Sequence, residues 1–311
     1  MSFDGSDVAS TEDSNDDGFQ RLDSFPRTAA SNDIVSNDDG ESDDDSSFVG
    51  SLSTTDAIDL SAGQLQGPEK LMDFSSQISG LSITSLSLSG NNFVDPSEKQ
   101  KYNDDRFSNR GPLALAAALA DHQTVTSVDV SENSLGAKGQ SGIVALARAS
   151  GMGVIKVLDV GNNQMLGPKG NRYDGIRAIA KAVETASGTA LAELTLSQNG
   201  LHASAVCFLG VSLVDTTLEH LDLSGNSVGV DSLGRRSNAG MSSLLTPFAS
   251  DRCNLRSLNL SENFLGNEEC TMLASVLESM FDLRELDLSF NDIHAVGARH
   301  LAAGEEEKRR G

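Results

Sequence analysis

The string LEHLDLSGNSV at residues 218–228 decides the fold, because the same pattern returns along the chain. With Leu218 as position 1, apolar residues stand at positions 1, 4, 6 and 11, and an asparagine stands at position 9. The other six clear copies span residues 83–93, 125–135, 155–165, 191–201, 255–265 and 283–293. Seven matches at five constrained positions indicate an internal repeat.

The spacing between the copies sets the size of the repeating unit. The asparagines at position 9 lie 42, 30, 36, 27, 37 and 28 residues apart. A base period of about 28 residues with insertions accounts for all six spacings. One period before Asn91, residues 55–65 form a weaker copy in which Gly63 stands at position 9. We therefore predict eight units and a repeat domain that covers residues 52–304.

Each unit is predicted to contain a short strand, a turn and a helix. Apolar residues at positions 4 and 6 predict a strand whose apolar side chains point into the coil. The asparagine is expected to bond backbone groups that the turn leaves unpaired, so that stacked units form a ladder. The ladder consists of Asn91, Asn133, Asn163, Asn199, Asn226, Asn263 and Asn291. Helical spacing follows in residues 176–183, whereas Pro247 predicts a short or broken helix after Asn226.

This string resembles the leucine-rich repeat, and a unit of about 28 residues with a true helix resembles the ribonuclease-inhibitor-type subfamily. The resemblance covers about residues 52–304. It implies an α/β solenoid, or horseshoe, with a parallel sheet on the concave face and helices on the convex face. It implies no single function, because the same architecture serves ribonuclease inhibitors, the arrays of NOD-like receptors and Ran GTPase-activating proteins.

The charge of the chain is strongly negative and unevenly distributed. The net charge is −22, from 23 basic and 45 acidic residues, and residues 1–50 hold fourteen acids and two arginines. Residues 1–51 are therefore predicted to be a disordered Ser/Asp-rich tail, either simply solvating or regulated by phosphorylation. Residues 305–311 form a charged C-terminal end. An acidic surface of this kind argues against nucleic acid and anionic membranes as partners.

The sequence contains no motif that predicts catalysis, a metal site or a cofactor. The three cysteines, Cys207, Cys253 and Cys270, are too far apart to suggest a disulfide framework or a Cys-x-x-Cys metal site. There is no Gly-rich phosphate loop followed by Lys-Ser or Lys-Thr. The absence of a signal-peptide pattern and of a long apolar run predicts a cytoplasmic location. We expect a monomer without enzymatic activity.

The first candidate binding surface is the outer face of the predicted sheet. Its candidate residues are Asp129, Asp159, Glu193, Glu219, His220, Asp222, Arg256, Arg284, Asp287 and Phe290. An acidic trough here is suited to a basic protein or peptide, and Phe290 at position 8 is the strongest single hot-spot candidate. The alternative interpretation is that Leu-Asp-Leu is simply a common sequence in such repeats and that each aspartate is only solvated.

The second candidate surface is the rim at the carboxyl ends of the strands. The three long spacings follow alternate clear copies, so their extra residues are expected to emerge on one edge of the array. Their basic residues are Lys99, Lys101, Arg106, Arg110, Lys169, Arg172, Arg235 and Arg236. They indicate either a site for an acidic partner or solvated loop residues among acids. The acidic tail folding back onto this rim is a further hypothesis.

These observations favour a non-enzymatic scaffold that binds a protein partner. A Ran-type activator of a small GTPase is the alternative that the resemblance offers. It implies an arginine on an early strand-to-helix loop that assists GTP hydrolysis by the partner, and Arg106 or Arg110 occupies the comparable loop. The acidic segment, however, stands before the repeats here, whereas that family usually carries one after them.

Overall fold

A computed structural model describes residues 56–308, except residues 66, 95–108, 137–139, 153, 185–190 and 251–253. The acidic segment 1–51 predicted from the sequence lies outside the described residues, as do residues 309–311. In the part that is described, no helix is long and apolar enough to cross a membrane.

Eight short parallel strands form one sheet in the order of the sequence. Each strand consists of positions 3 to 5 of its string, whereas the apolar pattern predicts a strand over positions 3 to 6. The strands are β1 (Ala57–Asp59), β2 (Ser85–Ser87), β3 (Ser127–Asp129), β4 (Val157–Asp159), β5 (Glu193–Thr195), β6 (His220–Asp222), β7 (Ser257–Asn259) and β8 (Glu285–Asp287). Position 4 pairs with position 4 across every neighbouring pair, which places equivalent residues in rows.

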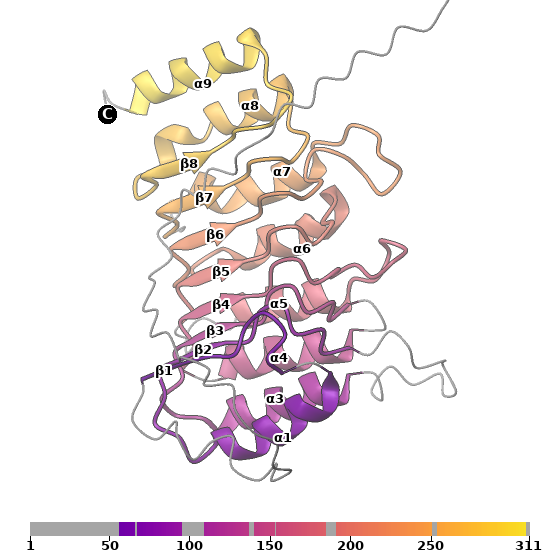
Figure 1. The fold of residues 1–311 in the computed structure, drawn as a ribbon. Helices are drawn as coiled ribbons and strands as arrows, with labels where there is room; N and C mark the ends of the chain where they lie inside the picture. Colours follow the sequence, from indigo (N-terminus) through magenta and orange to yellow (C-terminus); the bar gives the residue numbers. More distant parts are fainter. Residues whose placement is uncertain are drawn as a thin grey trace, which may run out of the picture. The chain divides into compact units, whose positions relative to one another are not determined.

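Helices line the other side of the sheet and complete the units (Figure 1). They are α1 (Pro68–Ile78), α3 (Arg110–Asp121), α4 (Ser141–Met152), α5 (Asp174–Glu184), α6 (Ala203–Ser212), α7 (Ala239–Leu245), α8 (Asn267–Ala274) and α9 (Ala295–Lys308). The helix α7 has seven residues and passes into the 3₁₀ turn Thr246–Ser250, which contains Pro247. The last helix is longer than residues 295–303, the span expected from its apolar pattern.

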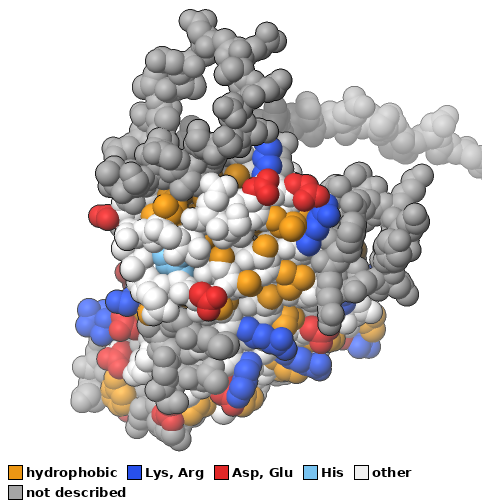
Figure 2. All heavy atoms as spheres, turned by 90° about the horizontal axis from the view of Figure 1, so that it is seen from below, with side chains coloured by type: hydrophobic (Ala, Val, Ile, Leu, Met, Phe, Trp, Pro, Cys, Tyr) orange, Lys and Arg blue, Asp and Glu red, His pale blue; other side chains and the backbone are white. Residues whose placement is uncertain are grey.

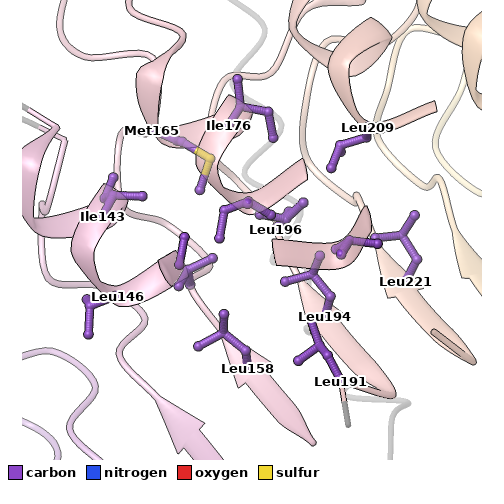
Figure 3. Close-up of a cluster of buried hydrophobic side chains, with 14 of the residues drawn as sticks. Ile143, Leu146, Leu158, Met165, Ile176, Leu191, Leu194, Leu196, Leu209 and Leu221 are labelled. Atoms are coloured by element: carbon purple, nitrogen blue, oxygen red, sulfur yellow. The ribbon is translucent and has the colours of Figure 1, made fainter. Parts of the chain in front are cut away.

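The core lies between the two layers and consists of the apolar positions of the repeat. Figure 3 shows Leu158 and Leu194 of the strands directed toward Ile176 and Leu209 of the helices, with Met165 beside them. All five side chains are at most 2% exposed. Burying one such side chain contributes about 1.5–3 kcal/mol, and the repetition of this packing supplies the apolar burial that each short unit lacks alone.

The asparagines at position 9 connect the turns of successive units. Asn163, which is 0% exposed, accepts hydrogen bonds at Oδ1 from the backbone N–H of Asn133 (3.1 Å) and Leu135 (3.2 Å). Its Nδ2 donates to the carbonyls of Val130 (2.9 Å), Val160 (3.1 Å) and Gly161 (3.1 Å). The other asparagines bond the preceding turn in the same way. Each side chain therefore satisfies buried backbone groups of its own unit and of the unit before it.

The residue at position 8, just before the asparagine or Gly63, has a left-handed backbone in all eight units. The φ angles at position 8 are 57° at Ala62, 71° at Gly90, 59° at Glu132, 50° at Asn162, 54° at Gln198, 64° at Gly225, 55° at Glu262 and 53° at Phe290. Glycine adopts this conformation without strain, whereas a bulky residue there is unusual. Six of these residues have a side chain other than glycine, so most units retain some backbone strain at this turn.

We expect Asn163→Ala to lower the free energy of unfolding by about 3–5 kcal/mol, because it leaves several buried backbone groups without partners. Urea unfolding followed by circular dichroism measures the change. Asn162→Gly is the matched control, since Asn162 is exposed and its φ of 50° suits glycine. Equal losses in both variants would contradict the role of the ladder.

A second prediction concerns the close approach of two turns at Gly229. Its N–H donates to the carbonyl of Asn263 (3.0 Å), and a Cβ added to Gly229 would overlap the backbone carbonyl of Phe264. We expect Gly229→Ala to destabilise the protein by about 1–3 kcal/mol through overpacking. Gly80→Ala is the control, because a Cβ there meets nothing within 4 Å. A thermal shift of the same size in both variants would refute this account.

Candidate functional site

The outward side chains of the sheet form rows in register along the array. The row at position 5 consists of Asp59, Ser87, Asp129, Asp159, Thr195, Asp222, Asn259 and Asp287. It holds five carboxylates and no basic side chain. Neighbouring strands in a sheet are about 4.8 Å apart, so the adjacent pair Asp129 and Asp159 brings two like charges close together. The expected aspartates therefore lie in one row, which Ser87, Thr195 and Asn259 interrupt, whereas Glu193 and Glu219 lie outside it.

The carboxylates of this row also have a structural role that sequence reasoning missed. Oδ1 of Asp129 accepts the N–H of Ser131 (2.9 Å), and Oδ1 of Asp222 accepts the N–H of Ser224 (2.7 Å). The same bond recurs at Asp59, Asp159 and Asp287. Asn259 makes it with an amide oxygen (3.0 Å to the N–H of Ser261). One oxygen therefore ends the strand in an Asx turn, and a neutral amide performs this part equally well.

The rows at positions 2 and 3 carry mixed charges toward the C-terminal units. Arg256 and Glu219, both candidate binding residues, form an ion pair with each other (Nη1–Oε2, 2.6 Å). Glu193, His220 and Arg284 are exposed. Figure 2 shows acidic and basic side chains interspersed with apolar ones on the described surface at the α1 end. The acidic character of the sheet face is therefore concentrated in the row at position 5.

Phe290 extends into solvent at the end of this face. It is 75% exposed and has a φ of 53°. A second aromatic residue that the sequence analysis did not select, Phe264, is 57% exposed with a φ of 57°. Phe264 stands at position 10 of the preceding unit. The sequence feature that could have identified Phe264 is a large aromatic residue directly after the ladder asparagine Asn263.

The structure describes five of the eight basic residues that the sequence assigned to the rim. Lys99, Lys101 and Arg106 lie outside the described residues. Arg110 is the first residue of α3, is half-buried, and forms an ion pair with Glu69 of α1. Lys169 and Arg172 are exposed in the loop before α5. Arg110 thus stands where the loop passes into α3 and connects two helices.

The loop between β6 and α7 is held by its own hydrogen bonds. The Asp231 carboxylate accepts the N–H groups of Leu233 (2.9 Å) and Arg235 (3.0 Å) at Oδ1, and Arg235 Nε at Oδ2 (2.8 Å). Hydrogen bonding from the Arg235 side chain is the main reason that the pKa of Asp231 lies below its ordinary value of 3.8. At the base of the loop, Arg236 bonds the carbonyl of Phe264 and pairs with Asp292.

A shallow cavity of about 360 Å³ adjoins this loop at the N-terminus of α8. It is lined by Arg236, Ser237, Asn238, Gly266, Asn267, Glu268, Glu269, Asp292 and His294. The Glu269 side chain accepts the N–H of Gly266 (2.8 Å), and Arg236 is paired with Asp292. Glu269, Arg236 and Asp292 are therefore committed to local structure.

The thiols described by the structure are not activated. Cys207 and Cys270 are free, and burial raises the pKa of each thiol above its ordinary value. Within the described ranges, no group of three or more His, Cys, Asp or Glu side chains is placed to hold a metal ion. The polar chemistry of the described surface consists of carboxylates, ion pairs and backbone caps.

Comparison with known proteins agrees with this geometry. The family model described as Leucine Rich repeat matches residues 214–233 and 279–302. NACHT, LRR and PYD domains-containing protein 1a of Mus musculus is 39% identical over 87 residues, which cover 28% of this chain and 7% of that protein. The ribonuclease inhibitor of Mus musculus is 31% identical over 147 residues, which cover 47% of this chain and 29% of the inhibitor. The matched segments thus span less than a third of either relative.

Among solved structures, the leucine-rich repeat-containing protein LegL7 from Legionella pneumophila is similar, with 24% identity and a TM-score of 0.47. The match covers 75% of this chain and 64% of that one. The repeated string and the eight-stranded parallel sheet with its layer of helices together define a leucine-rich repeat array. In its repeat and in these matches, the chain is similar to leucine-rich repeat proteins of the ribonuclease-inhibitor type.

We expect Arg235→Gln to move the pKa of Asp231 upward, toward its ordinary value of 3.8. Because the folded-state pKa is lowered, the ionised carboxylate stabilises the loop above that ordinary value. This contribution is lost as the pH falls through the lowered folded-state pKa. A carbon-13 NMR titration of the Asp231 carboxyl measures the shift. An unchanged midpoint would mean that the N–H groups of the loop, and not the arginine, hold the pKa down.

Proposed function

We propose that this protein is a non-enzymatic scaffold that binds a basic segment of a protein partner along the carboxylate row of its sheet. The supporting observation is the row itself: five carboxylates at equivalent positions on strands in register. A rigid array of this kind presents charge without an ordering cost at binding, and complementary charge increases both the rate and the specificity of association.

At Asp222 and Asp287 the hydrogen bonds from described residues engage Oδ1, which supports binding through Oδ2, whereas Oδ2 of Asp129 also accepts the Ser87 hydroxyl (3.4 Å). The Asx turn uses Oδ1 and fixes the orientation of the carboxylate, so the charge is held in place. Among the described residues, no lysine or arginine forms an ion pair with Asp129, Asp222 or Asp287. A partner that brings lysine or arginine side chains to this row supplies the missing positive charge.

Other observations support binding as the role of the array. The name of the mouse ribonuclease inhibitor states a protein target, and the present chain has the same type of array. The thiols have a raised pKa, which makes them poor nucleophiles at neutral pH. Free thiols also suit a reducing compartment, which favours the cytoplasm.

We expect the triple variant Asp129→Asn, Asp159→Asn and Asp222→Asn to lose partner binding without losing stability. The amide retains the Asx turn, as Asn259 does, while three charges are removed. At about 0.5 kcal/mol for each exposed pair, the affinity falls by about tenfold or more. Capture from a cell extract, quantified by mass spectrometry at two salt concentrations, measures the loss.

The comparison of wild type with this variant also tests the alternative. Recovery of basic proteins that are lost with the variant and at high salt supports the proposal. An unchanged set of captured proteins would contradict it. Recovery of a small GTPase whose hydrolysis is stimulated, and stimulation that Arg106→Ala removes, would favour the activator instead.

A further inference from the structure

Three exposed apolar residues lie on the rim at the carboxyl ends of the strands of the last three units. We call Leu233, Phe264 and Phe290 the rim patch; they are 73%, 57% and 75% exposed. They come from three consecutive units, and Figure 1 shows the loop after β6, which contains Leu233, extending from this edge. Exposed apolar side chains that gather on one edge indicate an interaction site more often than the same residues scattered singly.

The loop that presents Leu233 is organised before any partner binds. Its two sides are bridged by Val230 and Arg236, and the Asp231 carboxylate accepts hydrogen bonds from the loop backbone and from Arg235. Leu233 stands at the tip, between these bonded residues. A surface loop with this much internal bonding holds its apolar side chain in one place, which lowers the entropy cost of binding.

The two phenylalanines occupy backbone positions that suit other residues better. At position 8 the other seven units have Ala, Gly, Glu, Asn, Gln, Gly and Glu, and only the last has an aromatic residue. At position 10, left-handed backbone is otherwise found at Asn92, Ser134, Gln164 and Gly200. Bulky side chains in this conformation are strained and gain little packing in return when they are exposed. Strain retained at two exposed aromatic residues points to a function for their side chains.

Arg236 joins the parts of the patch into one surface. Its guanidinium bonds the backbone carbonyl of Phe264 and the carboxylate of Asp292, two residues beyond Phe290. The loop of the sixth unit is therefore attached to the turns of the seventh and eighth units. Arg236 therefore links the three chain segments that carry Leu233, Phe264 and Phe290.

The charged side chains around the patch identify the chemistry of its partner. Arg235 and Arg236 are already paired with Asp231 and Asp292. Glu262 and Glu268 are exposed and, within the described part of the chain, form no ion pair with a basic side chain. Asp287 stands at position 5 of β8's unit, in the carboxylate row of the sheet. Acidic residues without a basic partner thus flank Phe264 on both sides along the chain, and Asp287 precedes Phe290 by three residues.

We propose that the rim patch binds a segment of a protein partner in which apolar side chains stand next to lysine or arginine. The apolar side chains pack on Leu233, Phe264 and Phe290, and the basic side chains meet Glu262, Glu268 and Asp287. The proposal deepens the proposed function, on which it rests, by placing the apolar part of the interface on the rim beside the acidic row.

The test uses a library of random 12-residue peptides displayed on phage and selected on the full-length protein. We expect the selected peptides to combine apolar residues with lysine or arginine. Measured by fluorescence anisotropy, their affinity falls by about tenfold or more in the double variant Phe264→Ala and Phe290→Ala. Phe281→Ala is the matched control, because Phe281 is 71% exposed but precedes β8, at the opposite end of the strand; it changes the affinity less than about twofold.

A second measurement separates binding from folding. Phe264→Gly and Phe290→Gly relieve the left-handed backbone, so we expect each to raise Tm by about 2–4 °C while weakening peptide binding. Gln198→Gly at position 8 of β5's unit is expected to raise Tm equally and leave binding unchanged. Peptides without basic residues, or affinities that the phenylalanine variants do not change, would overturn the proposal. In that case, if the variant Asp129→Asn, Asp159→Asn and Asp222→Asn still loses the partner captured from a cell extract, the proposed function of the carboxylate row stands without the rim patch.

Discussion

The whole array depends on one side-chain amide that bonds to two neighbouring turns. A unit of about 28 residues has a strand of three residues and cannot satisfy the backbone groups of its own turn. The asparagine at position 9 supplies both an acceptor and two donors at this point, and no apolar or charged residue of the same size offers that combination. Where it is buried, as at Asn133 and Asn199, the turn of one unit is completed only by the next.

This constraint also creates the surface. Because the asparagines hold the turns in register, position 5 falls beside position 5 along all eight strands, and the outward side chains add up to rows. The aspartates in this row close their own turn with Oδ1, and at Asp222 and Asp287 the bonds of the described residues leave Oδ2 for a partner. A residue needed for the fold and a residue available for a partner are thus the same residue, so its frequency in the repeat is not by itself a sign of binding.

The repeat string predicted most of the fold. Period and phase placed every strand within a residue, identified the asparagines, and indicated the short helix before Pro247. The candidate site was less predictable, because its geometry depends on contacts between units of unequal length. The ion pairs of Arg110 with Glu69 and of Arg236 with Asp292 cross such insertions. The Asx turns and the strained Phe264 depend on local backbone angles, which an apolar pattern does not report.

The asparagine bonds run in one direction along the chain. The Oδ1 of each asparagine accepts N–H groups of the preceding unit, and its Nδ2 reaches back to the same unit. No corresponding side-chain bond is directed from a ladder asparagine to the unit that follows it among the bonds described here. Loss of one asparagine therefore removes hydrogen-bond partners from its own turn and from the turn before it, and the effect of such a change along the array is asymmetric.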